Sequence, residues 1–151
     1  PSAWLRTGFV AAMEQAGDDP PEWVQGMRGY GRRFASRFGR FAIQESIEFS
    51  AGMALGEDPR YFPCQCRGPL KRAGHAVLST IVARNRNGGR TLALARIGGI
   101  YGGALASMAW YPSRYTLAGD GIRQGNISLA ITGGTNLIRE FWPDLKRLAG
   151  R

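Results

Sequence analysis

Three side chains able to bind a soft metal or carry thiol chemistry lie close together in the chain. They are Cys64 and Cys66 in FPCQCRGP and His75 a little further on. A structural metal site usually needs four ligands, and these residues supply at most three soft ones. A disulfide between cysteines two positions apart is expected to be strained. We therefore interpret the pair as thiols, free or available for a bond to a second chain, with a metal site as the alternative.

The remaining polar residues form no catalytic pattern. His75 lies in an apolar helical pattern, which favours a packed or interface histidine over a general base. The stretches GDGIRQG (119–125) and ITGGTN (131–136) lack the lysine and the strand–turn–helix context of a phosphate-binding loop. The carboxylate pairs at 18–19 and 57–58 precede proline, as caps and turns do. The sequence therefore predicts a protein that is not an enzyme, with no catalytic residue, metal or cofactor.

Proline and glycine divide the chain into five segments with helical patterning. The segments cover approximately 3–16, 22–55, 70–84, 91–111 and 117–141, and a short basic tail follows over 144–148. An aromatic pair followed by proline occurs three times, and proline cannot continue a helix. Alternating strand patterns are scarce. We therefore predict an all-α bundle of about five helices, glycine-rich and closely packed, in a single domain over 1–151.

Small residues recur four positions apart in four of these segments, so they share helix faces. In segment 91–111 two adjacent rows form a strip with almost no side chain: Ala95, Gly99 and Gly103, and Gly98, Gly102 and Ala106. Gly121 and Gly125 repeat the spacing in the last segment. Glycine weakens an isolated helix by about 1 kcal/mol relative to alanine. We therefore interpret the strip as a surface where a second helix packs closely, within the chain or between subunits.

The glycine-rich segment also has the length of a membrane span. It matches the roughly 20 residues that a helix needs to cross a bilayer, and its one charge, Arg96, lies near an end. However, it is only mildly apolar, and segment 117–141 carries Asp120 and Arg123, which are costly to insert. Two alternatives stay open: a membrane-embedded or membrane-apposed hairpin around 91–141, or a chain at a membrane surface or in water.

A basic and aromatic helix precedes it, GYGRRFASRFGRF at 29–41. On a helical wheel the four arginines lie on one side and the aromatic rings on another: Arg32, Arg33, Arg37 and Arg40. The net charge is +9, from 20 basic and 11 acidic residues, which favours anionic partners. Such a helix places its guanidinium groups on lipid phosphates or on nucleic acid. A solvated basic face above an ordinary core stripe is the third interpretation.

The aromatic pairs beside the prolines suit a membrane–water interface, where an apolar ring and a polar group each find their medium. These candidate interface residues are Tyr61, Phe62, Trp110, Tyr111, Phe141 and Trp142. The alternative is that the rings close a bundle in water.

Several stretches together resemble a group of uncharacterised exported helical proteins of acidobacteria. They are PPEWVQGMRGYGRRF (20–34), EDPRYF (57–62), KRAGHAV (71–77), the GG-rich helix ending in WYP (98–112) and REFWPDL (139–145). The similarity runs from about Phe9 to Leu145, and EDPRYF and EFWPD are its most specific parts. The resemblance implies a signal peptide upstream, export to the cell envelope and no assigned activity. CQC at 64–66 is not a feature of that group.

These features predict a non-catalytic structural or assembly protein of the bacterial cell envelope, periplasmic or associated with the outer membrane. It would form a homo-oligomer or join a larger assembly through its small-residue faces, at a membrane surface or in the bilayer. A basic helical nucleic-acid-binding module is one alternative. An envelope enzyme whose site is dispersed over several helices is the other.

Overall fold

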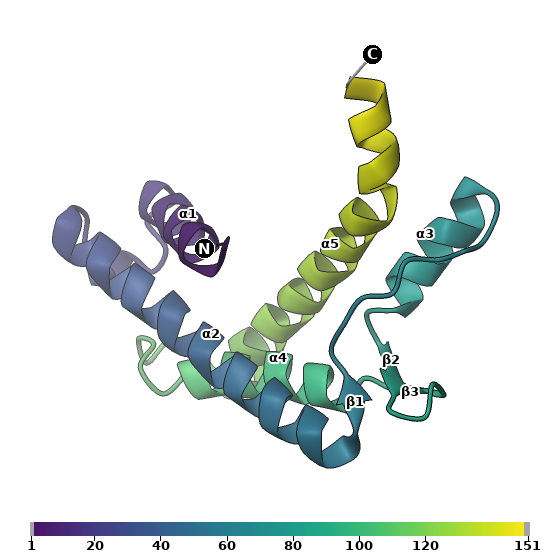
Figure 1. Cartoon of the computed structure of the whole chain (residues 1–151). Coiled ribbons are helices and arrows are strands. Elements are labelled where there is room, and N and C mark those ends of the chain that lie inside the picture. The colour runs from purple at the N-terminus through teal and green to yellow at the C-terminus, as the bar shows by residue number, and fades with distance from the viewer. Residues whose placement is uncertain (1, 150–151) are drawn as a thin grey trace.

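Five α-helices account for most of the chain in the computed structural model, which describes residues 2–149 (Figure 1). The first two, α1 (Ser2–Ala16) and α2 (Met27–Leu55), are joined through a 3-10 turn at Pro21–Trp23. The others are α3 (Pro69–Leu78), α4 (Leu94–Ser107) and α5 (Ile122–Ala149), the last preceded by a π-helical turn at Leu117–Gly121. The predicted all-α bundle of about five helices is confirmed.

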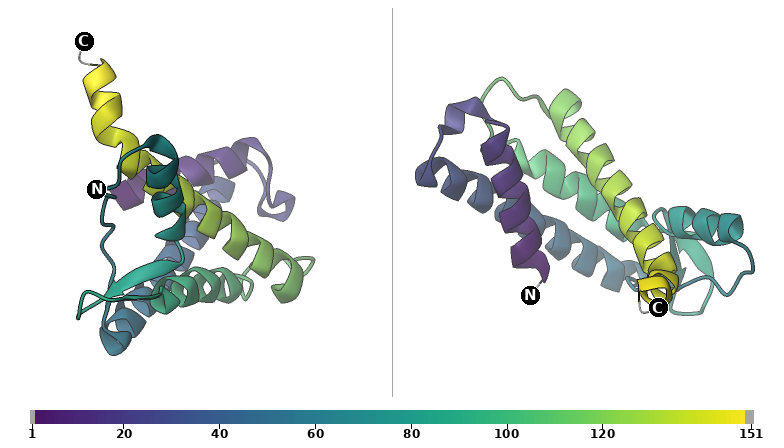
Figure 2. Two further views of the ribbon diagram at one scale, coloured as in Figure 1. Left: turned by 90° about the vertical axis from the view of Figure 1, so that its right-hand side faces the viewer. Right: turned by 90° about the horizontal axis from the view of Figure 1, so that it is seen from above.

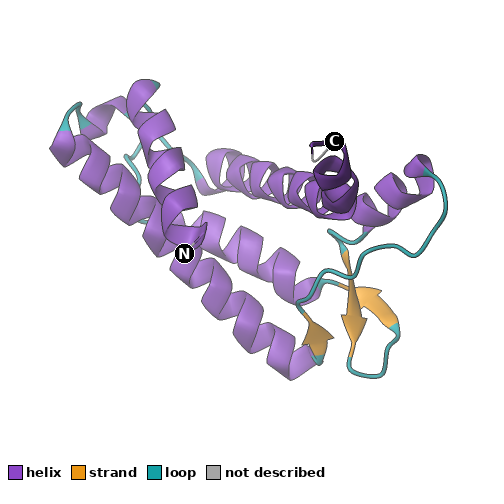
Figure 3. Cartoon of the chain, turned by 45° about the horizontal axis from the view of Figure 1, so that its top comes forward, coloured by secondary structure: helices purple, strands orange, loops and turns teal. Residues whose placement is uncertain are grey.

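A small antiparallel sheet, which the sequence analysis did not predict, lies at one end of the helices (Figure 3). It consists of β1 (Glu57–Asp58), β2 (Val82–Asn85) and β3 (Arg90–Leu92), in that order. The side-chain oxygen of Asn85 accepts hydrogen bonds from the backbone N–H groups of Asn87 and Gly89, at 3.1 and 2.8 Å. NRNGG therefore closes a β-hairpin, and the helix expected over 70–84 ends at Leu78.

The helices form two layers. α2 and α4 pack along each other below, α1 lies on α2, and α5 lies on α4. Seen from above, α1 and α5 lie apart from one another, with α4 visible between them (Figure 2). α3 stands on the sheet side and packs against α5. Glu57 ties the sheet to α4, because its carboxylate accepts from the backbone N–H groups of Leu94 and Ala95, at 3.0 and 3.2 Å, and so caps that helix.

Two helices have different limits from those expected. α4 has 14 residues because residues 90–92 pair in the sheet and the chain leaves the helix at Ser107. α5 continues through Pro143 to Ala149. Arg72 binds Glu140 and Asp144, on either side of this proline, and thereby supports the helix where the proline lacks an N–H donor. Within residues 2–149, no helix is long and apolar enough to cross a membrane.

The interior of the bundle contains few large apolar side chains. Among the described side chains nine hydrophobic ones are buried, six of them alanines, while 23 large hydrophobic ones are exposed. Arg33 and Glu140 are among the largest fully buried side chains. The accessible surface is 9817 Å², which is about 2,300 Å² more than the roughly 7,500 Å² expected for a folded chain of 16.5 kDa. The chain alone therefore leaves much of its apolar surface in contact with water.

Candidate functional site

The first small-residue row of α4 packs against α2. Ala95, Gly99 and Gly103 are buried. A Cβ atom added to Gly99 would lie 2.7 Å from the carbonyl oxygen of Gln44, and one added to Gly103 would lie 2.9 Å from that of Arg40. Both distances are shorter than real Cβ atoms adopt, so only glycine permits this helix spacing. The contact expected of this row lies inside the chain.

The second row lies at the edge of that contact. Gly98 is exposed, with no atom within 4 Å of an added Cβ, and Gly102 faces the Ile47 side chain. Ala106 is half-buried. Gly121 and Gly125 are both buried, and they accommodate the Leu105 and Tyr101 side chains, at 2.9 and 2.5 Å from an added Cβ. The small residues thus join α2, α4 and α5 of one chain, and Gly98 is the member that lies outside the contact.

The arginines of α2 do not form one exposed basic face. Arg33 has no exposed surface. Its guanidinium donates to the carbonyl oxygens of Asp19, Pro20 and Val24, at 3.0, 2.8 and 2.8 Å, and to Oε1 of Gln15 at 2.6 Å. It therefore holds together the turn between α1 and α2. The expectation that Arg33 contacts an anionic partner was wrong, because the backbone of its own chain occupies its donors.

Two further arginines are also engaged within the chain. Arg37 binds the Glu14 carboxylate of α1. Arg40 is 6% exposed and donates to Oε1 of Gln124 and to Oγ of Ser128 on α5, at 2.6 and 2.7 Å. Burial and the positive charge of Arg37 lower the pKa of Arg40 to about 10. The prediction of an anion contact was thus wrong for Arg40 as well, and of the four arginines only Arg32 is exposed.

Four of the six candidate interface aromatics bind other elements of the same chain through polar or cation–π contacts. The Tyr61 hydroxyl donates to Glu140 at 2.6 Å, and the ring of Phe62 lies 4.6 Å from the guanidinium carbon of Arg84. The Trp110 indole N–H donates to Ser36 on α2 at 2.8 Å. The Phe141 ring lies beneath the guanidinium of Arg72.

The other two differ in exposure. The Tyr111 ring packs on Trp23, with ring centroids 4.9 Å apart. Trp142 is half-exposed and has the Lys146 ammonium over its ring. The aromatic pairs therefore mainly join segments of the fold, which was the alternative interpretation, while Trp142 lies at the surface.

A second buried polar cluster surrounds Glu140, a residue that no pattern in the sequence indicated. Its carboxylate accepts from the Tyr61 hydroxyl at 2.6 Å, the Cys64 backbone N–H at 3.0 Å and Nε of Arg72 at 3.1 Å. Burial opposes the ionised form, but these hydrogen bonds and the charge of Arg72 outweigh it and lower the pKa of Glu140. Burial and the Glu140 contact raise the pKa of Tyr61. We call these residues, with Asp144, the Glu140 junction.

The Glu140 junction joins three stretches that are well separated in the sequence. Tyr61 lies in EDPRYF, Arg72 in KRAGHAV, and Glu140 and Asp144 in REFWPDL. The junction connects the loop after β1, α3 and α5. The only signal for this junction in the sequence is the clustering of aromatic and charged residues beside prolines. The spacing of these residues does not indicate which of them contact one another in the fold.

The cysteines lie in the same loop. The structure pairs Cys64 and Cys66 in a disulfide, so the expectation of two thiols was wrong. The two Cα atoms lie 5.2 Å apart, within the range of about 4.4–6.8 Å that disulfides usually span. His75 Nε2 donates a hydrogen bond to the Phe62 carbonyl oxygen at 2.9 Å. This bond attaches α3 to the loop after β1. Within residues 2–149 no group of three or more His, Cys, Asp or Glu side chains could hold a metal ion.

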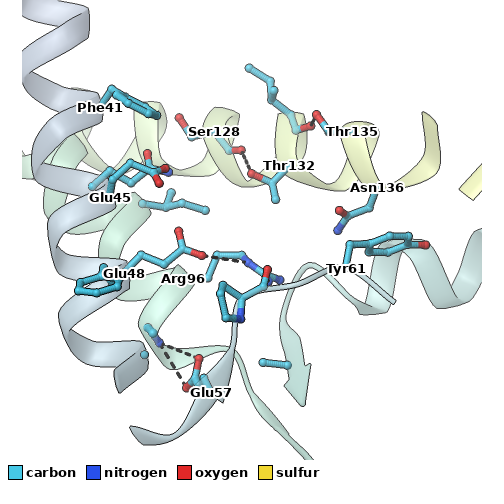
Figure 4. Close-up of a pocket in the computed structure, with 18 of the residues that line it drawn as sticks. Phe41, Glu45, Glu48, Glu57, Tyr61, Arg96, Ser128, Thr132, Thr135 and Asn136 are labelled. Carbon is cyan, nitrogen blue, oxygen red and sulfur yellow. Dashed lines mark hydrogen bonds and ion pairs between the residues drawn. The ribbon is translucent and has the colours of Figure 1, made fainter. Parts of the chain in front are cut away.

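An open groove runs between α1 and α2 on one side and α5 on the other, with α4 as its floor (Figure 4). Its volume is about 770 Å³. Apolar side chains and polar side chains share the lining; the apolar group includes Phe41, Phe49, Ile100, Ile127 and Ile131. Across the groove floor, Glu48 lies 3.5 Å from Arg96. Burial, partly offset by Arg96, raises the pKa of Glu48. The groove contains no nucleophile–base pair among the contacts of the described residues.

No known family profile, curated protein or solved structure matches this chain.

Proposed function

We propose that this chain is a non-catalytic structural subunit that buries its remaining apolar surface by associating with copies of itself or with partner subunits. The observation that carries the proposal is the ratio of buried to exposed apolar side chains. Soluble monomers rarely expose contiguous apolar patches larger than a few hundred Å². Here α1 presents Leu5, Phe9 and Met13 at a spacing of four residues. The helix α5 presents a longer row of apolar side chains, which runs from Ile127 to Leu145. Each of the side chains in these two rows is at least 48% exposed.

The excess of about 2,300 Å² over the surface expected for this mass is close to what one partner contributes to a large obligate interface. The small-residue rows are not the surface that we propose for assembly, because they already join helices of one chain. The bacterial cell envelope as the place of this assembly rests on the resemblance to exported proteins.

The test is the mass of the purified chain in detergent-free buffer, measured by light scattering over a wide range of concentrations. A multiple of 16.5 kDa that grows with concentration supports the proposal. A mass of one chain at every concentration, with no capture of a partner protein from an envelope extract, contradicts it.

An anionic membrane surface is the second candidate, favoured by the outward apolar stripe of α1 together with the net charge of +9. Vesicles containing phosphatidylglycerol test this candidate by co-sedimentation. Binding that salt weakens, with no self-association, would favour it over the assembly.

A further inference from the structure

We propose that the outward face of α5 binds the same face of a second copy of this chain, in an antiparallel helix pair related by a two-fold axis. This inference rests on the proposed function and names its contact surface.

The outward face of α5 carries a continuous apolar stripe, which we call the α5 stripe: Ile127, Ile131, Ile138, Trp142 and Leu145. These side chains are 48–58% exposed. At 100° per residue they fall, with Gly134, within an arc of about 80°. The opposite side of α5 holds the buried residues Gly125, Asn136 and Glu140. The α5 stripe therefore lies on the side of α5 opposite these buried residues, and its members Ile127 and Ile131 also border the groove.

The spacing of the α5 stripe is nearly the same read from either end. In an antiparallel pair centred near position 136, Ile127 opposes Leu145 of the second copy, and Ile131 opposes Trp142 of the second copy. The same centre places Gly134 opposite Ile138 of the second copy. No atom lies within 4 Å of a Cβ added to Gly134, so this glycine leaves a hole, and isoleucine is the knob that fills it.

The area of the α5 stripe is sufficient for such a pair. Five half-exposed side chains present on the order of 500 Å² per chain, so two copies bury about 1,000 Å², where specific interfaces begin.

A lipid surface would also bind an apolar stripe with basic flanks. Binding to lipid does not require that Gly134, which has no neighbouring atom, lies opposite Ile138 of a second copy, whereas the two-fold pair uses this arrangement. The pair also places positive charges of the two copies near one another, since Arg123, Arg139 and Lys146 are exposed beside the stripe. Salt should therefore strengthen the pair, whereas it weakens binding to anionic lipid.

The experiment compares Gly134→Leu with Gly98→Leu by sedimentation equilibrium. Both glycines lie in helices with no atom within 4 Å of an added Cβ, so a side chain can begin at either position without a clash, and both variants gain helix propensity. We expect Gly98→Leu to associate like the wild type. Filling the hole in Gly134→Leu should raise the dissociation constant by roughly ten- to a hundredfold.

A second pair of variants tests the register. Ile131→Glu and Trp142→Lys should each weaken self-association, and mixing them should restore a dimer through a Glu–Lys contact. Equal association of Gly134→Leu and Gly98→Leu, or no recovery on mixing, would overturn this inference and leave the proposed function standing. A wild-type chain that associates neither with itself nor with a partner protein would overturn both. If phosphatidylglycerol vesicles bind the wild type but not Ile131→Glu, and no dimer forms, the α5 stripe binds lipid instead.

Discussion

Adding one methyl group at two neighbouring positions of α4 should have clearly different effects on the free energy of unfolding. At Gly99 an added Cβ lies 2.7 Å from the Gln44 carbonyl oxygen, 3.1 Å from Glu48 Cβ and 3.3 Å from the Glu48 backbone nitrogen. At Gly98 it meets nothing within 4 Å. Gly99→Ala must therefore push α4 away from α2, while Gly98→Ala adds a methyl group in open space.

The magnitude follows from two contributions. Alanine in place of glycine favours either helix by about 0.8–1.0 kcal/mol, and this contribution cancels in the comparison. Overpacking against backbone costs about 1–3 kcal/mol, and only Gly99→Ala carries it. We therefore expect Gly98→Ala to be more stable than the wild type by about 1 kcal/mol, and Gly99→Ala to be less stable than Gly98→Ala by about 1–3 kcal/mol.

Urea unfolding followed by circular dichroism at 222 nm (a standard helix signal), at one fixed protein concentration, measures this difference. Gly102→Ala serves as an intermediate control, because its added Cβ meets only the flexible end of Ile47. Equal stabilities for Gly98→Ala and Gly99→Ala would refute the packing that we describe between α2 and α4.

Other predictions concern the buried charges. Glu140→Gln should lower the free energy of unfolding by about 1–3 kcal/mol at neutral pH, because a neutral amide replaces the buried carboxylate that accepts hydrogen bonds from Tyr61, the Cys64 N–H and Arg72. Since the pKa of Glu140 is lowered in the folded state, its contribution is complete above the unfolded carboxyl pKa and disappears as the pH falls through the folded value. Stability curves of wild type and variant should therefore converge in acid, and a constant difference at all pH values would contradict the prediction. Arg33→Met should lower the free energy of unfolding by about 3 kcal/mol or more, because three carbonyl groups lose their hydrogen-bond donor. Arg32→Met should change the free energy of unfolding by less than about 0.5 kcal/mol. Chemical denaturation of both variants measures these changes, and equal losses would refute the roles assigned to the two arginines.

The helices could be predicted from the sequence because local signals set most of their limits. Gly56 has a positive φ of 68° and ends α2 directly after Leu55, as a helix-terminating glycine does. The small row of Ala95, Gly99 and Gly103 was recognisable from its spacing. The spacing does not indicate which helix packs against this row; in the structure it is α2 of the same chain.

The sheet and the polar contacts were harder to predict for physical reasons. The strands have two to four residues, too short for an alternating pattern to be counted, although NRNGG between them is a hairpin signal. Arg33 and Glu140 bind groups that are distant in sequence or belong to the backbone, and neither kind of partner leaves a pattern in the chain. The helical pattern therefore predicts a surface position for Arg33, although this side chain is completely buried.

The central claim is that association completes the burial of apolar side chains, and the midpoint of thermal unfolding as a function of protein concentration tests it most directly. If folded copies bind one another, mass action makes the midpoint rise with concentration, and we expect this rise for the wild type at neutral pH. A midpoint that stays constant over the whole range, for a chain with the mass of a single copy, would contradict the account.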